Sequence, residues 1–148
     1  MKSFLTVVFT LSLLFVISCN SYPWIVIGSL KENEVDSWLN TISGGKPSEI
    51  DIAGKWHDAE GSGSFGWGEG YLRQEQSKIS GAIGGYSVKG VVSGKIVYLA
   101  FSSRGTVYYT ARLELLQDLL IGDYFDGFDK KQTKGNSMSL EKTLGATK

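Results

Sequence analysis

The chain of 148 residues is 42% hydrophobic and 12% aromatic, and its 15 basic and 15 acidic side chains leave no net charge. This balance excludes the electrostatic footprint by which proteins bind nucleic acid or adhere broadly to anionic lipid. A single cysteine excludes an intramolecular disulfide, so an exported domain of this chain must be stable through packing alone.

The N-terminal segment has the pattern of a secretory signal peptide over residues 1–18. After a lone lysine, residues 4–17 form an uncharged apolar run of 14 residues. This run is too short for a membrane span, which needs about 20 apolar residues. Val16, Ser18 and Cys19 at its end resemble the lipobox of bacterial lipoproteins. The resemblance implies a lipid anchor on Cys19, with acyl chains such as palmitate in the membrane.

The residue after the cysteine bears on localisation. By the same resemblance, Asn20 favours the outer membrane of the cell envelope, facing the periplasm, because an Asp there retains lipoproteins in the inner membrane. The alternative is a plain secreted protein that is cut elsewhere, with Cys19 incidental. Removal of residues 1–18 leaves one acidic residue in excess, so attachment would rest on the acyl chains. The remaining 130 residues suit one domain and a short tether.

Residues 19–50 are predicted to form this tether, with one short helix over residues 33–42. Asn33 can cap the helix, with Asp36 three residues on, and Gly44-Gly45 ends it. Apolar residues recur at helical spacing on one face, at Val35, Trp38, Leu39 and Ile42. Because so short a helix is marginal in isolation, we expect it to form only where its Trp38 face packs on the domain.

Over residues 51–148, glycine recurs among aromatic and β-branched residues, which is typical of short strands joined by tight turns. Eight strands are predicted, over residues 54–59, 66–76, 78–86, 87–93, 95–102, 106–116, 119–126 and 137–143. Their short connections require antiparallel neighbours, and closing the sheet removes the exposed edges. The sequence therefore predicts an all-β domain, an antiparallel eight-stranded up-and-down meander barrel.

Three strands carry further information. The strand 106–116 alternates, with one dry face at Val107, Tyr109, Ala111, Leu113 and Leu115. Residues 96–101 are apolar on both faces, so their outer side needs cover, for which the Trp38 helix is the candidate. In the strand 66–76, glycine occupies every second position from 66 to 70. This spacing indicates barrel curvature, or the close approach of another group.

Short motifs in these strands resemble the calycin group of meander barrels, which includes lipocalins and avidins. The motifs are Gly54-Lys55-Trp56 at the first strand, Ile79-Ser80-Gly81 in the third, and the run 86–97. The resemblance implies a small closed barrel over residues 51–148. The interior of an eight-stranded barrel is just wide enough to be filled by side chains or to hold one small ligand.

The residues offer little for catalysis. His57 is the only histidine, and its neighbour Asp58 points to the opposite face of a strand, so the two do not form a dyad. A Cys–His pair and a His-based zinc site are excluded, and no G-x-S-x-G elbow occurs. Asp123, Asp126 and Asp129 lack the spacing of a calcium loop. The sequence therefore predicts a protein that is not an enzyme and that holds no metal or cofactor.

Aromatic residues are the candidates for ligand binding. If the barrel has a cavity, its predicted lining is Trp56, Tyr71, Tyr86, Tyr98, Tyr109 and Tyr124. The first functional prediction is a monomeric, membrane-anchored barrel that binds a small apolar or amphipathic ligand. The alternative is a solid barrel that docks or inhibits an envelope protein, or docks a cell-wall partner. Neither prediction involves nucleic acid.

Overall fold

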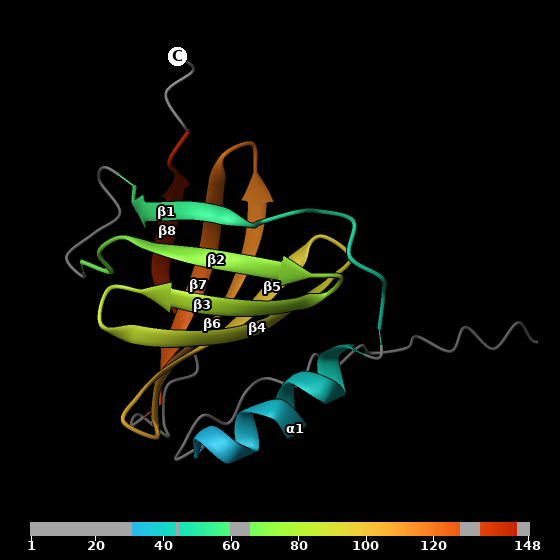
Figure 1. Ribbon diagram of the computed structural model, residues 1–148, viewed down its shortest axis with the longest axis vertical. Coiled ribbons are helices and arrows are strands. Elements are labelled where there is room, and N and C mark those ends of the chain that lie inside the picture. The colour runs from blue at the N-terminus through green and yellow to red at the C-terminus, as the bar shows by residue number, and fades with distance from the viewer. Residues whose placement is uncertain (1–30, 44, 60–65, 128–133, 145–148) are drawn as a thin grey trace, which may run out of the picture.

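The computed structural model describes residues 31–43, 45–59, 66–127 and 134–144 (Figure 1). This part of the chain holds one helix, α1 (Glu32–Ser43), and eight strands. The strands are β1 (Gly54–Asp58), β2 (Gly70–Glu75), β3 (Lys78–Ile83), β4 (Tyr86–Ser93), β5 (Ile96–Ser103), β6 (Thr106–Leu116), β7 (Leu119–Asp126) and β8 (Asn136–Lys142). The predicted signal peptide and Cys19 lie outside the described residues. Within the described ranges, no helix is long and apolar enough to cross a bilayer.

The strands form a closed barrel in which each strand pairs antiparallel with its neighbours in the sequence and β8 returns to β1 (Figure 1). Lys55 pairs with Tyr71 on one side of β1, and His57 pairs with Glu141 on the other side. The prediction of an eight-stranded up-and-down barrel is therefore confirmed. Tight turns account for most of this topology, because the five connections from β2 to β7 have two residues each and are too short for anything except antiparallel pairing.

The interior of the barrel is filled with its own side chains. Its core contains sixteen buried hydrophobic residues, among them Trp56, Leu72, Phe101 and Met138. One end is closed by the segment before β1, where Ile52 is fully buried. Gln74 of β2 holds this segment: its Oε1 accepts the Ile52 N–H at 2.9 Å and its Nε2 donates to the Ile50 carbonyl at 2.8 Å.

Helix α1 lies outside the barrel, over β4 and β5 (Figure 1). Its buried residues Val35, Leu39 and Ile42 form a second core with outward-facing residues of the strands. Those strand residues are Val91, Tyr98, Ala100 and Val107, with Trp38 and Ile96 packed against them. This contact confirms that the Trp38 face packs on the domain. It also explains why β5 is buried on both of its faces.

The helix starts differently from the prediction. It begins at Glu32, so Asn33 lies inside its first turn and does not cap it. Glu34 supplies the contact instead, because its Oε2 accepts the N–H of Lys31 at 2.9 Å and its own N–H donates to the Lys31 carbonyl at 2.8 Å. A side chain that reaches back to the residue before the helix satisfies a donor that the helix leaves unpaired.

A β-bulge corrects the predicted dry face of β6. Phe101 pairs with Tyr109 and Ser102 pairs with Val107, so Tyr108 is an extra residue opposite this step. An extra residue inverts the alternation of side chains on the bulged strand. Tyr109 therefore packs against the barrel core, whereas Val107 belongs to the core beneath α1. The prediction that both lie on one dry face is wrong at Val107.

The glycine-rich stretch before β2 is also corrected. Strand β2 begins at Gly70, so Gly66 and Gly68 precede it and do not alternate within it. Gly68 has a φ of +81°, which is not an extended conformation. A Cβ on Gly68 would lie 3.3 Å from the Cα of Gly84, in the β3–β4 turn. Because Gly68 and Gly84 both lack a side chain, the segment before β2 can pack closely on the β3–β4 turn.

Candidate binding site at the aromatic end of the barrel

Six aromatic residues gather at the end of the barrel where β1 joins β2, β3 joins β4, β5 joins β6 and β7 joins β8. We call this region the aromatic end. Its members are Trp67, Tyr86, Phe101, Tyr108, Tyr109 and Tyr124. They come from the segment before β2 and from four strands, β4 to β7. The sheet closure thus brings together residues that are far apart in the sequence.

Trp67 lies at the centre of the aromatic end and is only 2% exposed. Its ring centroid is 4.8 Å from that of Phe101, 5.0 Å from that of Tyr124 and 5.3 Å from that of Tyr109. The Asp58 carboxylate positions the segment, because it accepts the backbone N–H of Trp67 at 2.9 Å and that of Gly68 at 3.0 Å. Charge-assisted bonds of this kind are among the stronger hydrogen bonds in proteins.

The tyrosines around Trp67 contact one another edge to face. The ring centroids of Tyr109 lie 5.6 Å from those of both Tyr86 and Tyr124, with interplanar angles of 83° and 86°. Tyr108 completes the group at 5.8 Å from Tyr86. All four tyrosines are half-buried. Such packing keeps the rings rigid while part of each remains open to a ligand.

Tyr109 has the most perturbed hydroxyl of this group. Burial, then the proximity and hydrogen bond of Tyr86, and then Asp126 and Tyr124, raise the pKa of Tyr109 to about 12. The hydroxyl therefore stays protonated at neutral pH. The Tyr109 proton is used in the hydrogen bond with Tyr86, but tyrosine hydroxyls also accept hydrogen bonds and their rings are apolar, so the aromatic end can contact the polar and the apolar part of one ligand.

The predicted ligand-binding residues divide into two groups. Tyr86, Tyr109 and Tyr124 are brought together at the aromatic end. Trp56 is fully buried in the barrel interior, where its Nε1 donates to the Ile52 carbonyl at 2.9 Å and the Lys142 Nζ lies 5.6 Å from its ring centroid. The remaining two lie outside the barrel.

Tyr98 and Tyr71 do not face the barrel interior. Tyr98 is 7% exposed and packs in the core beneath α1. Tyr71 is 48% exposed on the outer face of β2, since its neighbour Leu72 takes the inward position. The six predicted ligand-binding residues therefore do not line a single cavity. Three of them, Tyr86, Tyr109 and Tyr124, lie together at the aromatic end.

Sequence reasoning missed Trp67, Phe101 and Tyr108 as members of the site. Trp67 lies in a glycine-rich stretch that was expected to continue β2, and the bulge that places Tyr108 beside Tyr86 leaves no pattern in the sequence. The usable signal was Asp58, because an acidic residue at the end of a strand can bind the N–H groups of a following loop.

The residues considered for catalysis have separate partners. His57 Nδ1 lies 3.1 Å from the Thr143 hydroxyl, and its Nε2 lies 3.8 Å from the Glu141 carboxylate. Asp58 binds the backbone, as described above, so the two residues do not form a dyad. The described residues contain no cluster of three or more potential metal ligands. Asp129, which belongs to the predicted acidic group, lies outside the described residues.

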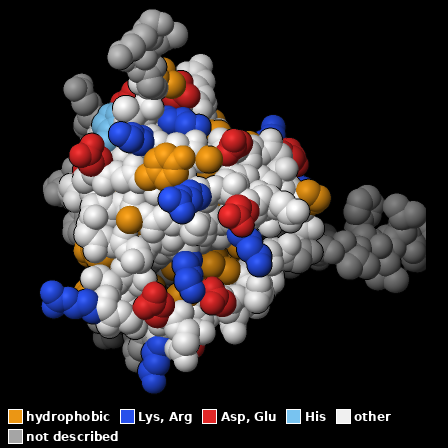
Figure 2. Space-filling model, viewed as in Figure 1, with side chains coloured by type: hydrophobic (Ala, Val, Ile, Leu, Met, Phe, Trp, Pro, Cys, Tyr) orange, Lys and Arg blue, Asp and Glu red, His pale blue; other side chains and the backbone are white. Residues whose placement is uncertain are grey.

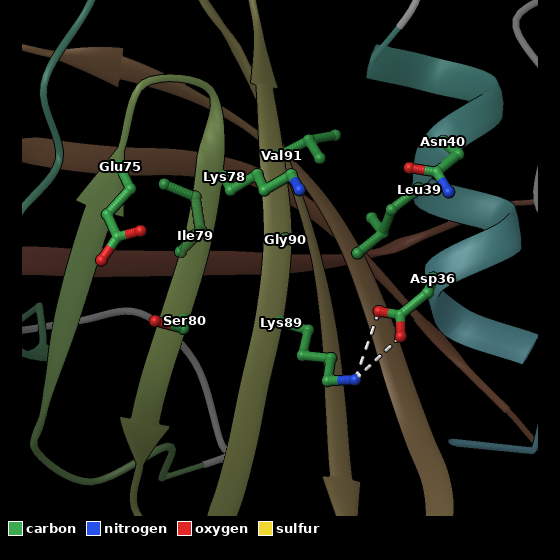
Figure 3. A pocket seen from close by; sticks show the side chains of 10 residues that line it. All are labelled: Asp36, Leu39, Asn40, Glu75, Lys78, Ile79, Ser80, Lys89, Gly90 and Val91. Atoms are coloured by element: carbon green, nitrogen blue, oxygen red, sulfur yellow. Dashed lines mark hydrogen bonds and ion pairs between the residues drawn. The ribbon is translucent and has the colours of Figure 1, made fainter. Parts of the chain in front are cut away.

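Three surface hollows lined by described residues lie outside the barrel interior. One of about 490 Å³ opens beside the contact of α1 with the sheet (Figure 3). Others, of about 600 Å³ and 360 Å³, adjoin the segment 47–51 and the outer face of β2 and β3. Figure 2 shows that hydrophobic side chains on the visible face are scattered among charged ones and form no continuous patch. The ring contacts between aromatic side chains of the described part are found at the aromatic end.

The described residues form a closed eight-stranded meander β-barrel with one external helix. No known family model matches the chain, and no curated protein and no solved structure matches it either.

Proposed function

We propose that this protein is a non-catalytic, lipid-anchored binding protein of the bacterial cell envelope that belongs to the calycin-like barrels. In this proposal, Cys19 carries the lipid and holds the protein at the outer membrane, facing the periplasm. The aromatic end holds a small amphipathic ligand. The gathering of Trp67 and four half-buried tyrosines at one end of the barrel carries the proposal.

The chemistry of the aromatic end suits an amphipathic ligand. Ring faces and edges contact apolar groups, while tyrosine hydroxyls contact polar ones. The ligand would rest on the aromatic end, because large buried side chains such as Trp56 and Phe101 occupy the barrel interior. Ligand sites in proteins commonly combine mostly apolar surface with a few placed polar groups.

The filled interior also favours a second function. A solid barrel can present the same aromatic end to a protein or a cell-wall partner, as a docking or inhibitory surface. Tyrosine and tryptophan are enriched among the residues that dominate such interfaces. The two proposals differ in the size of the ligand and not in the surface that binds it.

Fluorescence titration of the full chain with decanoate, kept below its micelle concentration, tests the first proposal. Replacement of Tyr86 by Leu should weaken binding at least about fivefold, because the variant loses a ring and a hydroxyl at the aromatic end. Tyr71→Leu is the matched control, since Tyr71 is 48% exposed on the outer face. Equal affinities in the two variants would exclude the aromatic end. Absence of decanoate binding, with no small molecule retained in native mass spectra of protein from its own host, would favour the docking function.

A further inference from the structure

A groove of about 490 Å³ opens beside the contact of α1 with the sheet and is lined by residues of α1, β3 and β4 (Figure 3). It is independent of the aromatic end. Its floor is apolar, with Leu39 on the helix and Val91 on β4, and both side chains are at least 95% buried. Because both residues are almost fully buried in the core beneath α1, the exposed apolar floor is small and matches one aliphatic side chain better than a long acyl chain.

The polar groups around this floor are unevenly satisfied. Lys89 is neutralised, because its Nζ lies 3.2 Å from both carboxylate oxygens of Asp36. Lys78 extends from β3 toward the helix, and Asn40 of the helix also lines the groove (Figure 3). Among the described residues, Lys78 has no carboxylate within 4.0 Å. The Glu75 carboxylate points away from the helix (Figure 3).

We propose that this groove binds a short peptide segment that carries a carboxylate beside an aliphatic side chain. The carboxylate contacts the Lys78 ammonium and the Asn40 amide, while the aliphatic side chain rests on Leu39 and Val91. Charge complementarity selects the occupant, since the groove offers an unpaired cation and an amide donor at one end and a neutralised pair at the other. The closed barrel has no free strand edge, so recognition relies on side chains and not on strand addition.

Methyl NMR of the full chain in detergent tests this proposal, with Leu39 and Val91 as reporters. The probes are N-acetyl-alanyl-leucine with a free carboxylate and the same dipeptide as its C-terminal amide. The free acid should shift both methyl signals saturably, and the amide should bind about tenfold more weakly because it lacks the charge that Lys78 recognises. Lys78→Gln should weaken binding of the acid by the same factor, whereas Lys55→Gln, on the outer face of β1, should leave it unchanged.

Several results would overturn the proposal. Equal binding of acid and amide would remove the role of the charge, and shifts confined to residues outside the groove would remove the site. Tighter binding of decanoate than of the dipeptide at the same methyl groups would identify an acyl chain as the occupant. The signals of Trp56 and Leu140 in the barrel interior show whether a variant is folded, because both residues are fully buried.

Discussion

Tyr109 shows how the environment of a single residue links the aromatic end to stability. Burial, reinforced by Tyr86, Asp126 and Tyr124, raises its pKa to about 12. The folded state therefore holds the phenolic proton more tightly than the unfolded state does. The resulting contribution to stability is fully present below about pH 10 and is lost as the pH rises toward about 12. We expect Tyr109→Phe to lose less stability over this pH window than the wild-type chain.

Two measurements check this prediction for Tyr109. Alkaline titration, followed by the ultraviolet absorbance of tyrosinate, should lose its phase near about pH 12 in Tyr109→Phe. Denaturant unfolding below and within the window should show the flatter pH dependence of the variant. Tyr71→Phe is the control and should keep the high-pH phase. If the titration phase near about pH 12 persisted in Tyr109→Phe, it could not be assigned to the Tyr109 hydroxyl.

The residues of the candidate site could be predicted only in part. Tyr124 and Tyr86 are on the inward face of strands whose alternation is visible in the sequence. Tyr71 was a candidate only because the strand faces were not known, and the inward position of Leu72 decides against it. The position of Trp67 depends on the positive φ of Gly68 and on the hydrogen bond between its backbone N–H and the Asp58 carboxylate. Neither feature can be predicted from hydrophobic periodicity.

At the scale of elements, β3 to β6 were the most predictable strands, because a two-residue turn fixes each of their ends. The bounds of β6 and β7 agree with the prediction, whereas β2 starts at residue 70 instead of 66. The helix was predictable from its apolar face, but its first turn depends on the contact between Glu34 and Lys31. Such a contact depends on one side-chain conformation, so a cap is harder to place than a periodic face.

The attachment of α1 to the barrel depends on few side chains, among which Leu39 is 5% exposed. Leu39→Ala should destabilise the docked helix by about 2–5 kcal/mol, because it removes buried methyl groups and leaves a cavity. Since an isolated helix of this length is marginal, α1 should then open locally while the barrel stays folded. Hydrogen exchange measured by mass spectrometry should show loss of protection over residues 32–43 alone.

Asn40→Ala is the matched control for this helix, because Asn40 is exposed on the next position of the same helix. It should leave the protection of α1 almost unchanged. If Leu39→Ala instead raised exchange equally in α1 and in the strands β2 and β3, the helix and the barrel would unfold as one unit. That result would contradict the view of α1 as a separately docked element.

At the scale of the whole molecule, the two ends of the barrel differ in structure. One end is closed by the buried Ile52 and its hydrogen bond to Gln74. The other is the aromatic end, where the described chain begins at Lys31, which bridges to Thr106 at the start of β6. Eleven residues lie between Cys19 and Lys31, so their α-carbons can be at most about 40 Å apart. A lipid on Cys19 would therefore keep the aromatic end close to the membrane.

The lipid anchor is open to a direct test by replacement of Cys19 with Ala in the native host. The chain has no net charge and a single cysteine, so neither a basic patch nor a second acylated cysteine would replace a lipid on Cys19. Cys19→Ala should therefore move the protein from the membrane fraction to the soluble fraction, or leave it as an unprocessed precursor. Ser21→Ala, which leaves the lipobox intact, should stay in the membrane fraction. A Cys19→Ala chain that is processed and still fractionates with the membrane would refute the anchor, because its attachment would then rest on another part of the protein.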